Sequence, residues 1–62
     1  MMNSARIQVR KNGRVIGYLT PKGSINRLRV HAAVYPLNRA YIEVAILADD
    51  NPNYGFSVQE EK

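Results

Sequence analysis

The chain has no cysteine, no tryptophan and only one histidine, His31. These absences exclude disulfide bridges, thiolate zinc sites, cysteine nucleophiles and metal sites built from several histidines. No apolar run is long enough to cross a bilayer or to serve as a secretory signal. We therefore expect a cytoplasmic protein with no cofactor, no metal and no membrane association.

The chain is also short, with 62 residues, which predicts one small domain over residues 1–62 and a disordered start at residues 1–4. A core of this size seldom supplies more than about 3–5 kcal/mol, and small domains often add a second source of stability. Without disulfides or metals, that source is association, so we expect a homodimer as one option.

Acidic residues are missing from a large part of the chain. Residues 1–39 hold eight Lys and Arg side chains and no Asp or Glu, whereas residues 40–62 hold five acids and a single Lys. The whole chain has a net charge of +4. An uneven distribution of this kind indicates a polyanionic partner, although it says nothing about the fold.

The stretch RKNGRV, residues 10–15, predicts a tight β-hairpin that turns at Asn12-Gly13. A two-residue turn fixes the cross-strand pairs. The pairs predicted for the apolar face are Lys11–Arg14, Val9–Ile16, Ile7–Tyr18 and Ala5–Thr20. The opposite face is predicted to be basic, with Gly17 leaving room for another backbone to approach.

Beyond the turn TPKGS, residues 27–36 alternate as a strand does. One side would hold Leu28, Val30, Ala32 and Val34, and the other Arg27, Arg29, His31, Ala33 and Tyr35. A last short strand is predicted where Tyr54, Phe56 and Val58 share one face.

Residues 37–50 fit two structures. As a helix capped by Asn38, they form a stripe of Leu37, Tyr41, Val44 and Ala48; as a strand, they place Ile42, Val44 and Ile46 on one face. The charges of Arg39, Asp49 and Asp50 oppose the helix dipole. The alanines, the length and the Asn51-Pro52 stop favour the helix.

The predicted fold is therefore α+β: a small antiparallel sheet in the order β-β-β-α-β, with one helix packed on one face. The runner-up is a five-stranded all-β barrel in which residues 37–50 form the fourth strand. The layout resembles that of small bacterial and phage open reading frames, a resemblance that implies no function.

Catalytic chemistry is not expected. A Ser-His-acid triad would depend on His31, and nothing in the sequence places a serine beside it. The stretch ADDNPN lacks the spacing of a calcium loop, and PKGS lacks the spacing of a P-loop. We expect a binding protein and not an enzyme.

Basic side chains on the open face of the predicted sheet and at the hairpin tip form the candidate site. They are Arg6, Arg10, Lys11, Arg14, Arg27 and Arg29. Arginine pairs bidentately with phosphate oxygens, and only Tyr35 is predicted on this face, so stacking on bases is not expected. The sequence predicts contacts with the nucleic-acid backbone, of DNA or of RNA.

The alternative is a protein-interaction module, an adaptor or inhibitor of the phage or mobile-element type. It would dock on an acidic protein surface or associate with itself. If residues 37–50 are helical, Ile42 and Ile46 lie off the main stripe and form an exposed apolar interface.

Overall fold

A computed structural model describes residues 3–61 and places one strand at the centre of the sheet. This strand, β1 (Ser4–Lys11), pairs along its whole length with β5 (Tyr54–Glu61). Its other edge is shared by β2 (Arg14–Leu19) at the hairpin end and β4 (Tyr35–Pro36) at the opposite end. A short strand, β3 (Ile25–Asn26), extends the sheet beyond β2, and all pairs are antiparallel.

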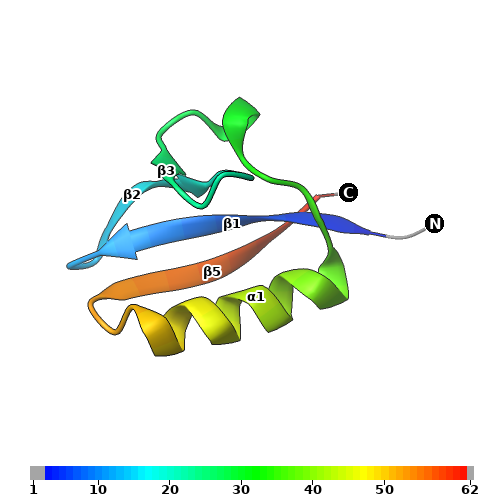
Figure 1. Cartoon of the computed structure of the whole chain (residues 1–62). Helices are drawn as coiled ribbons and strands as arrows, with labels where there is room; N and C mark the ends of the chain where they lie inside the picture. The colour runs from blue at the N-terminus through cyan, green and yellow to red at the C-terminus, as the bar shows by residue number, and fades with distance from the viewer. Residues whose placement is uncertain (1–2, 62) are drawn as a thin grey trace.

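One helix, α1 (Leu37–Asp50), packs along β5 and β1, on the opposite side of the molecule from β3 and the 3-10 turn η1 (Arg29–His31) (Figure 1). The chain is thus a small α+β fold, as predicted. The sheet curls like half of a barrel. In this respect the structure resembles the runner-up prediction, the five-stranded barrel. The segment 37–50, however, is a helix and not a strand.

The hairpin turn is confirmed at Asn12-Gly13. Asn12 has φ 53° and Gly13 has φ 78°, and a type I′ turn needs positive φ at both central residues. The following turn is also formed: the Thr20 amide donates to the Ser24 carbonyl at 2.9 Å, and the two hydroxyl groups lie 2.8 Å apart.

The predicted register of the hairpin is right only next to the turn. Lys11 faces Arg14, but a β-bulge then shifts the pairing, so that Val9 faces Gly17 and Gln8 faces Tyr18. The bulge moves Leu19 to the core face. A bulge of this kind increases the local twist, which contributes to the curl of the sheet.

Of the predicted strand over residues 27–36, only Tyr35–Pro36 is a strand. The segment leaves the sheet after Asn26, turns through η1 and returns only at β4. Because it has no strand partner, its alternation does not sort side chains into two faces. Leu28, Val30 and Val34 are exposed, while Ala32 and Ala33 are buried.

The core consists of Ile7, Val9 and Leu19, with Ile7 and Val9 fully buried. Partly buried side chains pack around them: Ile16, Tyr35, Val44, Leu47, Tyr54 and Phe56. Full burial of an aliphatic side chain contributes about 1.5–3 kcal/mol, so a core with so few fully buried large residues predicts modest stability.

The helix begins at Leu37 with Pro36 as its N-cap residue, so the predicted Asn38 cap was wrong. Its inward face holds Leu37, Ala40, Val44 and Leu47. The predicted stripe was right for Leu37 and Val44 but wrong for Tyr41 and Ala48, which are exposed.

The predicted disordered stretch over residues 1–4 overlaps the start of the described chain at Asn3 and Ser4. Ser4 begins β1, and the Asn3 carbonyl accepts a hydrogen bond from the Leu37 amide at 3.1 Å. Residues 1–2 lie outside the described residues. Within residues 3–61 no helix has the length and apolar character needed to cross a membrane.

Candidate nucleic-acid interface

The six predicted phosphate-binding side chains do not form one continuous surface. A continuous face required residues 27–36 to lie as a strand beside the hairpin, and they do not. The side chains instead fall into two groups, of two and four residues.

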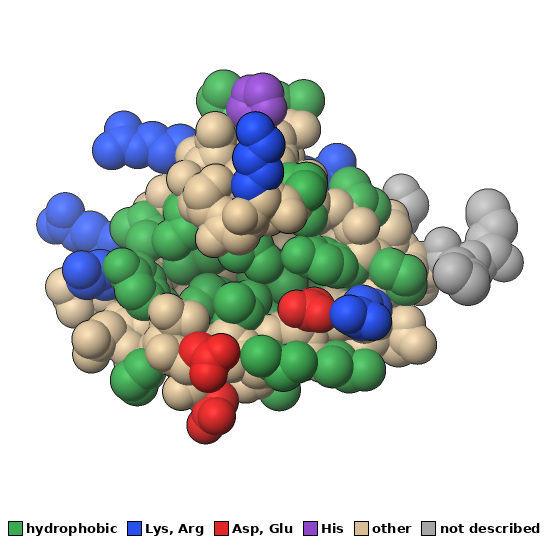
Figure 2. All heavy atoms as spheres, viewed as in Figure 1, with side chains coloured by type: hydrophobic (Ala, Val, Ile, Leu, Met, Phe, Trp, Pro, Cys, Tyr) green, Lys and Arg blue, Asp and Glu red, His purple; other side chains and the backbone are tan. Residues whose placement is uncertain are grey.

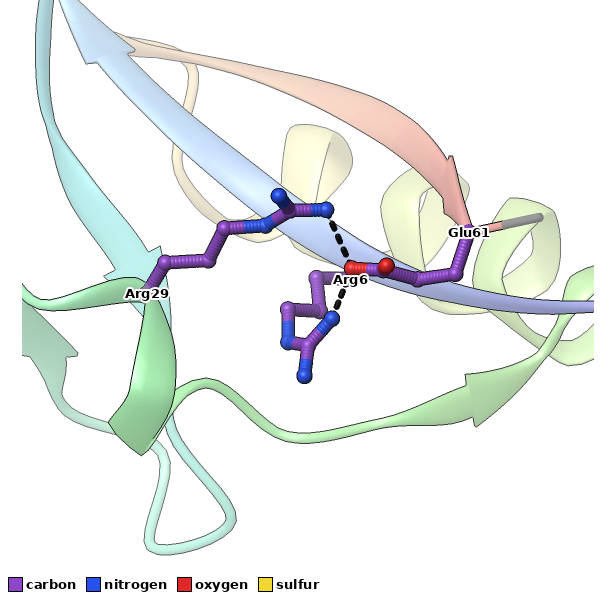
Figure 3. A network of polar contacts seen from close by, with 3 residues as sticks. All are labelled: Arg6, Arg29 and Glu61. Carbon is purple, nitrogen blue, oxygen red and sulfur yellow. Dashed lines mark hydrogen bonds and ion pairs between the residues drawn. The ribbon is translucent and has the colours of Figure 1, made fainter.

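Arg6 and Arg29 form the first group, and one carboxylate joins them. Glu61 Oε1 accepts from a guanidinium nitrogen of each arginine (Figure 3). Arg6 comes from β1, Glu61 from the end of β5 and Arg29 from η1, so the network links the sheet to η1. The side chains of Arg6 and Glu61 are 23% and 28% exposed, and Arg6 Nε is buried without a hydrogen-bond partner.

This pairing reduces the electrostatic attraction that Arg6 and Arg29 can offer to a phosphate. Their carboxylate partner is already in place and is only partly exposed to solvent, where screening is weaker than at an open surface. The geometry therefore supports the predicted phosphate-binding role of Arg6 and Arg29 less than that of the other four side chains.

The second group is the hairpin-end cluster: Arg10, Lys11, Arg14 and Arg27. All four side chains are exposed, and among residues 3–61 no carboxylate oxygen lies within 4.0 Å of their charged nitrogens. Figure 2 shows Lys and Arg side chains projecting from the end of the molecule where the β1–β2 hairpin turns.

Two members of the cluster are held by neighbours on the sheet. Arg10 Nε donates to Gln8 Oε1 at 3.3 Å, and Gln8 Oε1 is also within 3.4 Å of Ser57 Oγ. Lys11 Nζ lies 5.4 Å from the centre of the Tyr54 ring, which is a cation–π distance. Both contacts restrict a long side chain without neutralising its charge.

Arg14 and Arg27 line a shallow hollow of about 330 Å³ together with Val15, Ile16 and Gly17. Gly17 explains how they come together. A Cβ built on it would lie 2.5 Å from the Asn26 carbonyl oxygen, so the missing side chain lets β3 approach β2 and carry Arg27 towards the hairpin. Guanidinium groups suit phosphate oxygens, so two arginines beside one hollow are the chemistry that a phosphate needs.

Among residues 3–61, the aromatic side chains nearest the hairpin-end cluster are Tyr18, which faces Gln8, and Tyr54, and both are only partly exposed. Tyr35, predicted on the basic face, packs against the core instead. Burial raises the pKa of Tyr35, Glu43 raises it further, and Arg39 opposes the effect. Tyr54 is half-buried beneath Lys11, so contacts with the backbone remain the chemistry that this cluster suits.

Glu61 is the residue that sequence reasoning missed. The antiparallel pairing of β5 with β1 places Glu61 opposite Ser4 and on the same face as Arg6. The alternating pattern at the end of the chain predicts a strand. It does not show which residue of that strand faces which residue of β1, so the position of Glu61 beside Arg6 could not be read from it.

The predicted interface residues Ile42 and Ile46 lie on the outward face of α1, with exposures of 54% and 52%.

In the part of the chain that the structure describes, no group of three or more His, Asp or Glu side chains could hold a metal ion.

No family model, curated protein or solved structure matches this chain. Its function is therefore inferred from its own residues.

Proposed function

We propose that this protein binds the phosphate backbone of double-stranded nucleic acid in the cytoplasm through the hairpin-end cluster. The observation that carries the proposal is the exposure of Arg10, Lys11, Arg14 and Arg27 at one end of the fold, with no carboxylate within 4.0 Å among residues 3–61. Acids interspersed among exposed cations would be typical of a surface that serves solubility alone.

Binding of this kind depends on salt in a defined way. Each phosphate neutralised by a cation releases a counterion, and log K falls with log salt by about 0.9 per contact on a B-form duplex. If all four side chains of the cluster meet phosphates, the slope for DNA should be roughly −3.5. If Arg6 and Arg29 also contributed fully, it should approach roughly −5.5.

The first prediction concerns Arg14 and Arg27. Replacing both by Gln should weaken binding of a short DNA duplex at low salt and flatten the slope by roughly 1.8, because two counterion-releasing contacts are lost. Both side chains are exposed, so the free energy of unfolding should change by no more than about 0.5 kcal/mol. Fluorescence anisotropy over a salt series measures the slope.

The matched control is Lys22→Gln, which removes one positive charge from an exposed position in the turn over residues 20–24. Its slope should stay within about 0.3 of the wild-type value, because Lys22 is not a member of the cluster and would release no counterion from a contacted phosphate. If the slope changed by the same amount per removed charge in Lys22→Gln and in the variant of Arg14 and Arg27, that result would contradict a localised site. If the wild type binds neither DNA nor RNA duplexes at low salt, the proposal fails, and an acidic protein surface becomes the partner to test.

A further inference from the structure

The outward face of α1 carries an apolar stripe that the fold does not use. Tyr41 is 60% exposed, Ile42 54% and Ile46 52%, and Ala45 lies among them. Large apolar side chains along one helix line are typical of an interface, whereas isolated exposed ones are common on any surface. We call these four residues the α1 ridge.

Charges of opposite sign lie at the two ends of the α1 ridge. Arg39 is at the start of the helix with its side chain 63% exposed, and its Nε donates to Glu43 Oε1 of the same helix at 3.0 Å. Asp49 and Asp50 are exposed at the other end of the helix. In Figure 2 the lower part of the molecule, where α1 lies in Figure 1, shows green side chains, a blue group with a red group directly beside it, and further red groups towards the other end.

This order of charges is self-complementary. If a second copy of α1 lies antiparallel across the first, Arg39 of each copy meets the partner's Asp49 and Ile42 of each meets the partner's Ile46, while Ala45 near the centre allows close approach. Such matching is a property of isologous interfaces, in which the same patch faces itself across a two-fold axis. The Arg39–Glu43 pair is a largely exposed i,i+4 pair, which contributes little, so it leaves Arg39 able to contact a carboxylate of the partner.

The chain exposes somewhat more surface than a folded monomer of its mass is expected to expose. The chain exposes 4597 Å². The scaling of folded monomers predicts roughly 4,000 Å² at 7.0 kDa, so roughly 550 Å² is in excess. A helix of 14 residues is about 21 Å long, and a contact over its length would be a small interface, typical of weak association.

We propose that this protein forms a two-fold symmetric dimer through the α1 ridge, with α1 packed antiparallel against its copy. The proposal does not depend on nucleic-acid binding, because none of its residues belongs to the hairpin-end cluster. A dimer would present two such clusters, one on each copy.

A charge-swap experiment tests the pairing. Arg39→Asp and Asp49→Arg should each weaken self-association by roughly tenfold, because like charges then meet at both ends of the ridge. An equimolar mixture of the two variants should restore association to the wild-type level, since opposite charges again meet at both ends of the ridge in the mixed dimer. Sedimentation velocity and equilibrium over a concentration series measure the association, and far-UV circular dichroism confirms that each variant is folded.

Two further variants keep the test specific. Ile42→Glu should abolish association, because it buries a charge against the partner's Ile46. Lys22→Asp makes the same charge reversal as Arg39→Asp away from α1, and should leave association unchanged.

The proposal is overturned if the wild type sediments as a strict monomer at every concentration tested, which would leave the α1 ridge to a different protein. It is equally overturned if a dimer persists in Ile42→Glu, because the interface then lies elsewhere. Failure of the mixed variants to recover, with both singles folded and weakened, would exclude the antiparallel arrangement.

Discussion

At the scale of single residues, Gly17 connects the β-bulge of the hairpin with the approach of β3. Its φ of 151° lies in a region that L side chains rarely adopt, and it sits in the bulge where the register of β1 and β2 shifts. It also gives the β3 backbone room to approach, which brings Arg27 to the same hollow as Arg14. The curl of the sheet and the geometry of the candidate site therefore share one cause.

Substitution of Gly17 by Ala should destabilise the fold by about 2–4 kcal/mol, because the new Cβ meets the Asn26 carbonyl at a position that also strains the backbone. Gly55→Ala is the matched control. Its Cβ would lie 3.7 Å from the nearest atom, Arg10 Cβ, which is ordinary contact, so stability should hold or rise by up to about 1 kcal/mol. Urea denaturation gives both values, and an equal loss in the two variants would contradict this account of Gly17.

Residue-scale features were predictable where a local rule decides them. Asn12-Gly13 fixes the turn through its own backbone preferences. The missing side chain of Gly17 predicted that another backbone can approach there, and the β3 backbone does so. The bulge beside it and the bridge from Glu61 to Arg6 were not predictable. Both depend on register between strands, and the hydrophobic pattern tolerates more than one register when neighbouring positions are all apolar.

At the scale of elements, α1 forms although its N-terminus has no side-chain cap and its terminal charges are unfavourable. The structure shows no side-chain cap at Pro36, no acid in the first turn and no base in the last turn of this helix. Asp49 and Asp50 lie near the negative end of the helix dipole. Packing of the inward face must therefore supply the stability of the helix, as it does for most helices in proteins.

A prediction at this scale uses two alanines of α1. Ala40 is fully buried, so Ala40→Leu should overpack the contact with the sheet and cost about 1–3 kcal/mol. Ala48 is exposed, and Ala48→Leu should change stability by no more than about 0.5 kcal/mol. Thermal unfolding of both variants checks this, and a tolerated leucine at position 40 would show that the helix packs more loosely than the structure indicates.

The bounds of α1 were predictable from the sequence, but its orientation was not. Length, alanines and the Asn51-Pro52 stop define the helix, whereas apolar residues occur around most of its circumference, so several stripes compete for the inward position.

For the segment over residues 27–36, the predicted type of element itself was mostly wrong. Its alternation predicts a strand, but a strand needs a neighbour, and β1 already bonds to β5, β2 and β4.

At the scale of the whole molecule, the asymmetry of charge along the chain is only partly an asymmetry in space. The antiparallel return of β5 brings Glu61 beside Arg6 and Arg29, so two of the eight cations of residues 1–39 are paired by an acid from the far end of the chain. At the other end of β1, the same return places Gly55 and Tyr54 opposite Arg10 and Lys11, and neither is an acid. The fold thus leaves the hairpin-end cluster its positive charge.

The most direct test of nucleic-acid binding is a map of amide chemical shifts as a short duplex is added at low salt. The account predicts that the largest changes fall on residues 10–17 and on Arg27, with little change at Ile42 and Ile46 on the outward face of α1. Arg6 and Arg29, already paired with Glu61, should change less than Arg10 and Arg14. No change at the hairpin, or the largest changes on α1, would contradict it.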